Sequence, residues 1–244
     1  MNAKRNLGNI AINTFTAHQQ VLEHLSDVLR GRERTNLFFL NDHGFNIAQR
    51  DPNYRAILNH TDLLLNDGLG VMIGAKIWNI HLEENLNGTD LIPRLLNLCQ
   101  ENDWSVFLLG AREPAVKSAA ARLQQQFPSL QISGWHSGYM NDEQAIVQSI
   151  NQSGADVLLV GMGMPLQEKF IARHHAELAP VLRIAVGGYI DFASGMKKRA
   201  PKIMRRLNLE WLFRMILEPR RMWRRNVVGH LQFFIRVIAL KRYK

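Results

Sequence analysis

Short apolar runs alternate with helical patterns along most of this chain, and this alternation limits the folds it can adopt. The apolar runs are typical of strands buried on both faces of a sheet; they cover residues 36–41, 62–65, 105–109, 130–133, 156–160 and 182–186. Candidate helices lie between them, at residues 46–59, 70–78, 89–101, 113–126, 142–152 and 165–175. The pattern predicts an α/β fold, a Rossmann-like and mostly parallel sheet with helices on both faces.

Several residues in these segments predict local structure. Thr89 or Asp90 is expected to cap the third helix, and Asn141 or Asp142 the fifth. Cys99 is the only cysteine, so disulfide frameworks and CxxC metal sites are excluded, and it is expected to lie buried in a helix. The sequence contains no metal-ligand constellation, and we expect neither a metal nor a cofactor.

Basic charge is concentrated at the C-terminal end. Residues 196–244 hold 15 of the 30 lysines and arginines but only two acids, for a net charge of +13, whereas residues 1–195 carry −4. The apparent strands also stop near residue 195, and helices are expected at 204–217 and 222–240, separated by Pro219. We therefore expect two parts: an α/β body at 1–195 and a basic helical appendage at 196–244.

Large apolar residues are interleaved with this charge, a pattern that favours an anionic membrane surface over bulk water. The stretch 226–240 is too short and too polar to span a bilayer unaided, so lying on a membrane remains open. The N-terminal residues lack the apolar run of a signal peptide, which predicts a cytoplasmic protein. A basic tail also suits nucleic acid, but no RNP, KH or helix-turn-helix signature occurs, and we expect no nucleic-acid partner.

In open parallel sheets, ligands bind beyond the carboxyl ends of the strands, so the loops there hold the candidate site residues. Four loops contain unusual groups of polar residues and glycines. Their candidate residues are Asn41, His43, Asn66, Asp67, Gly68, Gly161, Gly163, Pro165, Gln167, Glu168, Gly187, Gly188 and Asp191.

Each candidate has two readings. Asp67 is a candidate general base, or a turn or cap residue before a helix. Asn41 and His43 are substrate contacts or ordinary loop residues. The glycine turns leave backbone N–H groups free for phosphate oxygens, or they pack closely against the sheet. Without a metal, a phosphate leaving group needs basic side chains, and the segment 197–202 is one source of them.

An ordered series of motifs over residues 36–225 resembles the WecG/TagA/CpsF glycosyltransferases, glycosyltransferase family 26. The most specific part is KRAP at 198–201, followed by LEWLFR at 209–214 and EPRR at 218–221. Earlier members of the series are Asn41, Asp67-Gly68, Asn87-Gly88-Thr89-Asp90, Phe107-Leu108-Leu109-Gly110, Gly161 to Glu168, Gly187-Gly188 and Asp191-Phe192.

The resemblance implies an inverting, metal-independent transferase that moves a hexose-type sugar from a UDP-sugar to a polyprenyl-diphosphate-linked acceptor. It implies a peripheral protein at the cytoplasmic face of the bacterial inner membrane, with Asp67 as the base that deprotonates the acceptor. The substrate-binding residues that it adds are Asn87, Thr89, Asp90, Gly110, Lys198, Arg199, Arg214, Arg220, Arg221 and Arg224.

Two positions depart from the family pattern: Asn85 stands where Arg is frequent, and Phe39 where Thr is frequent. Both departures bear on the donor or acceptor pocket more than on the class of reaction. A non-catalytic scaffold of a polysaccharide assembly complex is the alternative. The sequence does not indicate which sugar, acceptor or linkage is involved, and homo-oligomerisation stays open.

Overall fold

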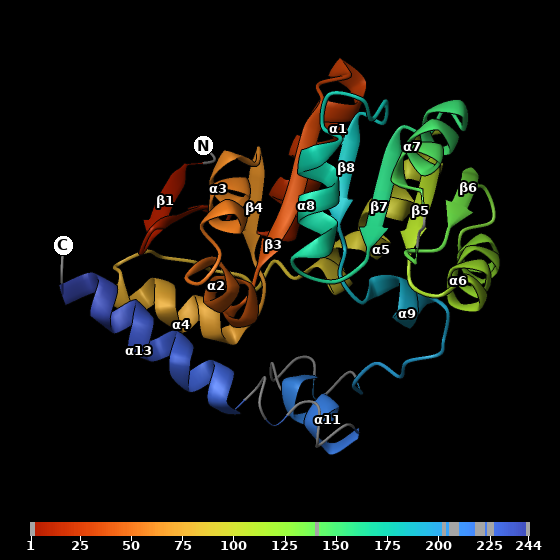
Figure 1. Cartoon of the computed structure of the whole chain (residues 1–244). Helices are drawn as coiled ribbons and strands as arrows, with labels where there is room; N and C mark the ends of the chain where they lie inside the picture. Colours follow the sequence, from red (N-terminus) through yellow and green to blue (C-terminus); the bar gives the residue numbers. More distant parts are fainter. Residues whose placement is uncertain are drawn as a thin grey trace.

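The computed structural model describes residues 3–139, 142–201, 204, 210–217, 223 and 227–242. Its centre is a six-stranded parallel sheet with the strand order β4-β3-β8-β7-β5-β6 (Figure 1). The strands are β3 (Thr35–Leu40), β4 (Leu63–Asn66), β5 (Val106–Gly110), β6 (Ile132–His136), β7 (Val157–Gly161) and β8 (Leu182–Ala185). The predicted α/β class and parallel sheet are confirmed.

Successive residues of each strand pack into two different hydrophobic cores, one on each face of the sheet. In β3, Leu37 and Phe39 belong to one core, whereas Phe38 and Leu40 belong to the other. This follows from the twofold period of side chains along a strand, and it explains why a strand buried on both faces is apolar throughout.

Helices cover both faces. One core lies beneath α1 (His18–Gly31), α5 (Gly88–Glu101), α6 (Glu113–Gln126) and the short α9 (Tyr189–Ala193). The other lies beneath α2 (Asp42–Ala48), α3 (Pro52–His60), α4 (Leu69–Ile77), α7 (Glu143–Gln152) and α8 (Leu166–Arg173). Cys99 is buried in α5, as expected.

Two parts of the chain differ from the sequence-based expectation. The helix predicted at 46–59 is two helices, because Asp51 caps a new helix whose first residue is Pro52. Before the first predicted strand, the chain also forms the hairpin of β1 (Lys4–Leu7) and β2 (Ile10–Asn13), followed by α1. The exposed and charged β1 lacks the apolar pattern by which a strand is recognised.

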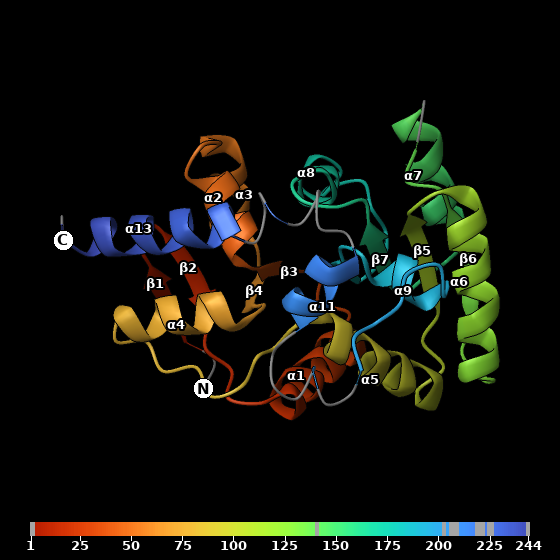
Figure 2. The ribbon, with the colours of Figure 1, turned by 90° about the horizontal axis from the view of Figure 1, so that it is seen from below.

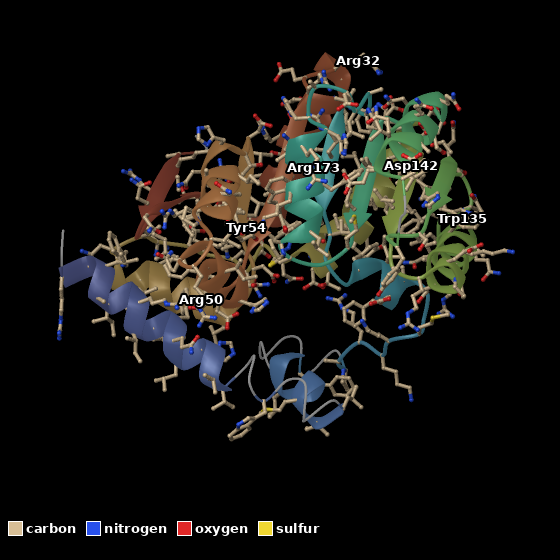
Figure 3. All side chains as sticks on the ribbon, in the orientation of Figure 1. Arg32, Arg50, Tyr54, Trp135, Asp142 and Arg173 are labelled. Atoms are coloured by element: carbon tan, nitrogen blue, oxygen red, sulfur yellow. The ribbon has the colours of Figure 1, made fainter. Side chains whose placement is uncertain are left out.

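One predicted helix cap is confirmed and one is wrong. Asp142 caps α7, and its carboxylate accepts hydrogen bonds from the backbone N–H groups of Gln144 and Ala145 (Figure 3). Asn141 lies outside the described residues. The cap of α5 is Asn87, two residues before Thr89 and three before Asp90, and its side chain accepts from the Asp90 N–H.

The described C-terminal helices are α11 (Glu210–Leu217) and α13 (Gly229–Arg242). They match parts of the two helices predicted there, while Pro219 lies outside the described residues. Figures 1 and 2 show α13 lying along α2 and α4, and α11 lying below the carboxyl edge of the sheet. Within the described ranges, no helix is long and apolar enough to cross a membrane.

Side chains of α13 enter the core of the body. Phe233 and Val237 are fully buried, and the Phe233 ring meets Phe45 edge-on at a centroid distance of 5.0 Å. Hydrogen bonds add to this packing, among them Trp78 Nε1 to Val237 O at 3.0 Å, Arg236 Nη1 to Asn46 Oδ1 at 2.7 Å, and Arg50 Nη2 to Gln232 Oε1 at 2.8 Å. Arg50 is labelled in Figure 3. The boundary near residue 195 stays a prediction, but α13 is packed as part of the body.

Candidate active site

A cleft of about 1660 Å³ follows the carboxyl edge of the sheet, because its walls include loops that leave the parallel strands. Most of the predicted site residues line it: Asn41, His43, Asp67, Gly68, Asn87, Thr89, Asp90, Gly161, Gly163, Gln167, Gly187, Gly188, Asp191 and Lys198. The two departures from the family pattern, Phe39 and Asn85, line it as well. Residues from six separate loops thus share one concave surface.

Other predicted site residues that the structure describes are not among those that line the cleft. They are Asn66, Gly110, Pro165, Glu168 and Arg199. Asn66 is fully buried and donates to the backbone oxygen of Glu84 at 2.9 Å. The side chain of Arg214 and the whole of Arg220, Arg221 and Arg224 lie outside the described residues, so the predicted arginine cluster remains an expectation.

Asp67 lies at one end of the cleft, directly after β4. Its backbone N–H donates to Leu40 O at 2.8 Å, and its Oδ2 accepts from Asn41 Nδ2 at 3.4 Å. The Asn41 side chain also caps α2 by accepting from the Gly44 N–H at 2.9 Å. Asn41 is therefore held by its own helix in a position to orient the carboxylate.

Asn85 supports the same turn from the opposite side. Its Oδ1 accepts a hydrogen bond from the Gly68 N–H at 2.7 Å. Gly68 has φ +100°, a conformation that side chains rarely adopt, and an added Cβ would meet no atom within 4 Å. The glycine is required by the backbone of the turn, and Asn85 fixes that turn beside Asp67.

Asp90 and Arg199 join two segments that the sequence separates widely. The Asp90 carboxylate accepts from Asn87 Nδ2 and pairs with Arg199 Nη2 at 2.7 Å. This ion pair attaches the segment after α9 to the start of α5. Lys197 pairs with Asp191 nearby, while Lys198 lines the cleft.

Gln167 connects the two glycine turns at the centre of the cleft. Its Oε1 accepts from the Gly163 N–H at 3.2 Å and from the Gly187 N–H at 3.0 Å. The sequence left two alternatives for these turns, N–H groups free for phosphate oxygens or close packing. These two N–H groups bond within the protein. Gln167 was predicted from the sequence to contact substrate, and in the structure its buried amide holds the two turns together.

Glu168 is the partner of this amide. It is fully buried, and its Oε1 accepts from Gln167 Nε2 at 2.7 Å. Burial raises the pKa of the Glu168 carboxyl to about 7. Because Glu168 accepts a hydrogen bond from the amide nitrogen of Gln167, the amide is oriented with its oxygen toward the two glycine N–H groups.

Replacing Gln167 by Leu is expected to loosen both turns, because a side chain of similar size would leave two partly buried N–H groups without their acceptor. Loss of such pairing costs about 1–3 kcal/mol, which predicts a fall of that size in the free energy of unfolding, measured by urea denaturation. Gln125→Leu is the control, since Gln125 is exposed on α6. Equal stability of the two variants would contradict the role given to Gln167.

Gly110 explains how the cleft wall is built. An added Cβ there would lie 2.3 Å from the backbone oxygen of Gly161, and the residue has φ +146°. The ends of β5 and β7 therefore approach so closely that only glycine fits. Its role in the fold is close packing of two strand ends.

The C-terminal segment forms part of the rim. Leu217 of α11 and His230 and Phe234 of α13 line the cleft. His230 Nδ1 lies 2.5 Å from Oδ2 of Asp42, the residue that follows Asn41. This contact ties α13 to the loop that orients Asp67.

Sequence reasoning missed several of the residues that line the cleft, among them Asp42, Arg112, Tyr139 and His230. Arg112 and Tyr139 follow the ends of β5 and β6, so the rule applied to the other strand ends indicates them as well. Asp42 and His230 become neighbours only when α13 packs on α2, and the sequence carries no local signal of that contact. Among the described residues, no group of three or more His, Cys, Asp or Glu side chains could hold a metal ion.

The fold and the cleft define an α/β protein whose ligand site lies beyond the carboxyl ends of parallel strands. Residues 5–244 match the model described as the Glycosyl transferase WecG/TagA/CpsF family, and the chain belongs to this family of glycosyltransferases. The resemblance seen in the sequence motifs is thereby confirmed.

Curated relatives carry a more specific name, N-acetylglucosaminyldiphosphoundecaprenol N-acetyl-beta-D-mannosaminyltransferase. The relative from Bacillus subtilis (strain 168) is 34% identical over 178 residues, which are 73% of this chain and 69% of the relative. The relative from Staphylococcus aureus (strain NCTC 8325 / PS 47) is 31% identical over 234 residues, 93% of this chain and 89% of the relative. The similarity thus extends over both the sheet and the C-terminal segment.

Proposed function

We propose that this protein is an inverting, metal-independent glycosyltransferase that moves a hexose-type sugar from a UDP-sugar to a polyprenyl-diphosphate-linked sugar. Such a reaction belongs to the synthesis of bacterial cell-surface polysaccharides, at the cytoplasmic face of the inner membrane. The names of the relatives support the lipid-linked acceptor and an N-acetylmannosamine unit as the transferred sugar.

The observation that carries this proposal is the single cleft that joins Asp67 to the glycine turns. Asp67 removes the proton of the acceptor hydroxyl as that oxygen attacks the anomeric carbon of the donor. The bond from this carbon to the diphosphate breaks on the opposite face, so configuration is inverted and UDP leaves with the electron pair. Asn41 keeps the carboxylate directed at the acceptor.

The negative charge that develops on the departing UDP must be stabilised by positively charged side chains in this reaction. Lys198 lines the cleft, and the predicted arginines of the C-terminal segment, Arg214, Arg220, Arg221 and Arg224, would add to it. Guanidinium groups bind phosphate oxygens in pairs of hydrogen bonds and can replace a divalent ion in this role. Metal independence is part of the proposal for this reason.

Release of UDP tests this function. We expect the full-length protein to release UDP only when a UDP-sugar and a lipid-diphosphate-linked sugar are both present, and to keep its activity in EDTA. Activity lost in EDTA and restored by Mg²⁺ would refute metal independence. No UDP release with any UDP-sugar would favour the non-catalytic scaffold instead.

We also propose that the rim helices rest on the membrane that holds the acceptor. Leu231, Ile235 and Ile238 of α13 recur at helical spacing and are exposed, at 63%, 58% and 43%. The neighbouring rim elements α4 and α11 also expose apolar residues; they are Leu69, Ile73, Ile216 and Leu217. A helix that is apolar on its outer side and basic elsewhere suits the interface of an anionic bilayer.

Replacing Leu231 and Ile235 together by Gln is expected to weaken binding to anionic liposomes about tenfold or more, because two apolar side chains no longer enter the bilayer. Flotation with liposomes measures this binding, and thermal denaturation should show an unchanged fold. Gln19→Ala, on the exposed side of α1, is the control. Undiminished flotation of the double variant would place the contact elsewhere.

A further inference from the structure

Glu168 is a carboxyl group buried next to Gln167, which lines the cleft. It lies in the first turn of α8 and is fully buried. Its Oε1 accepts from Gln167 Nε2 at 2.7 Å, whereas its Oε2 is buried and has no hydrogen-bond partner in the part of the chain that the structure describes. Burial without a counter-charge strongly disfavours a carboxylate, so these surroundings favour the neutral acid.

The charged groups of α3 and α8 do not compensate an ionised Glu168. Lys169, the next residue, pairs with Asp51 at the start of α3, with 2.6 Å between Nζ and Oδ2. Tyr54 of α3 is fully buried, and burial, together with the nearby carboxyl of Glu168, raises the pKa of its hydroxyl (Figure 3). The neighbour that α3 presents to Glu168 is therefore an uncharged hydroxyl.

Two other elements in contact with α8 carry cations, but not beside Glu168. Arg183 is near the start of β8, at the edge of the sheet away from the cleft. Arg173 is in the last turn of α8 and pairs with Glu143 of α7 at 2.6 Å. Within the described residues, the Gln167 amide and the backbone lower the pKa of the Glu168 carboxyl, and burial raises it by more.

The loop before α8 connects the two sides of the cleft. The Gln167 amide holds both glycine turns. A Cβ on Gly44 would lie 3.1 Å from Met164 Sδ, so the start of α2 packs against this loop. Asn41, which caps α2, also orients the proposed base. A change at Glu168 therefore reaches the proposed base as well as the glycine turns.

We propose that Glu168 is a positioning residue that acts as a neutral acid, and that the cleft keeps its active shape only while this carboxyl is protonated. The inference deepens the proposed function and rests on it, because sugar transfer reports the shape of the cleft. An ionised Glu168 is a buried charge with one amide partner, and movement of the side chain toward water relieves it. That movement removes the partner of the Gln167 amide and releases both turns.

The change should fall near neutral pH, because burial raises the pKa of the Glu168 carboxyl to about 7. The ratio kcat/KM for the UDP-sugar reports the ionisation of groups in the free enzyme. We expect it to fall about tenfold between about pH 6 and pH 8 in the unaltered full-length protein, as most of the Glu168 carboxyl loses its proton.

Glu168→Gln tests the role of this proton. Glutamine has the shape of the neutral acid, accepts from the Gln167 amide through its oxygen and does not ionise. At pH 6 the variant should transfer sugar as the unaltered protein does, and at pH 8 it should be about tenfold faster. Glu101→Gln, an exposed change at the end of α5, should follow the unaltered protein at every pH. The same fall with pH in both variants would overturn the inference.

Urea denaturation tests the neutral acid without any substrate. Because the pKa of the buried carboxyl lies above its ordinary value of 4.5, the folded protein binds the Glu168 proton more tightly than the unfolded chain does. The contribution of Glu168 to stability is then fully present below about pH 4.5, falls as the pH rises to about 7, and stays constant above that. The urea midpoint of Glu168→Gln should therefore rise relative to that of Glu101→Gln over this interval.

The two measurements can fail separately. A difference in urea midpoint that does not change with pH would mean that Glu168 is not held neutral, and would overturn the inference whatever the activity. If the unaltered protein transfers no sugar at any pH, the proposed function fails, and the urea midpoints alone decide the state of Glu168.

Discussion

Asp67→Asn is expected to lower turnover about 10²-fold or more while leaving the fold intact. Asparagine has the same shape and can still meet Asn41 Nδ2 through its oxygen, but it cannot accept the proton of the acceptor hydroxyl. Turnover is measured as sugar transferred to a lipid-diphosphate-linked acceptor, at saturating donor. The effect should fall on kcat, because the carboxylate acts in the transition state.

Asp103→Asn is a matched control for this variant. Asp103 is exposed, lies before β5 at the opposite edge of the sheet, and has φ +57°, a conformation that asparagine adopts readily. Its turnover should equal that of the unaltered protein. A folded Asp67→Asn variant with the same turnover as the control would remove Asp67 from the chemistry.

Phe233→Ala is expected to lower the free energy of unfolding by about 3–5 kcal/mol, the usual range for a fully buried phenylalanine. Its ring lies between Phe45 and Phe234, at centroid distances of 5.0 and 5.2 Å. A Cβ on Gly74 would lie 2.7 Å from the same ring, so α4 approaches it closely. Alanine would leave a cavity among three helices. Chemical denaturation of the full chain measures the change.

Leu231→Ala supplies the comparison within the same helix. Leu231 is exposed, and changes at such positions usually alter stability by about 0.5 kcal/mol or less. If both variants unfold at the same denaturant concentration, α13 does not contribute to the core. If Phe233→Ala has the expected effect, a chain ending at Ser194 should lose stability, because the core beneath α13 would be exposed.

Most of the sheet could be predicted because its strands are buried on both faces. A run such as Val157–Gly161 has apolar residues at nearly every position, and few other structures accommodate it. The start of α3 was missed because the helical pattern over 46–59 looks continuous. Pro52, which suits the first turn of a helix, was the local signal that a second helix begins there. The N-terminal hairpin depends on contacts with distant residues, such as the hydrogen bond from Ala11 N to Asn59 Oδ1.

The candidate site could be predicted in part, by the rule that ligands bind beyond strand ends. That rule indicated Asp67 and the glycine turns, and the structure brings them to one cleft. It could not show that Gln167 would bond to Gly163 and Gly187, because that contact requires β7 and β8 to be neighbours. Nor could it show that Asn85 would hold the turn beside Asp67, since the two are far apart in the sequence.

The most direct test of the account is a mass-spectrometric assay of sugar transfer. A panel of UDP-sugars, including UDP-N-acetylmannosamine, is offered with a short-chain lipid-diphosphate-linked N-acetylglucosamine. The account predicts that the full-length protein adds one sugar unit to the acceptor with one of these donors, and that Asp67→Asn adds almost none. An acceptor of unchanged mass with every donor, or equal product from both proteins, would contradict it.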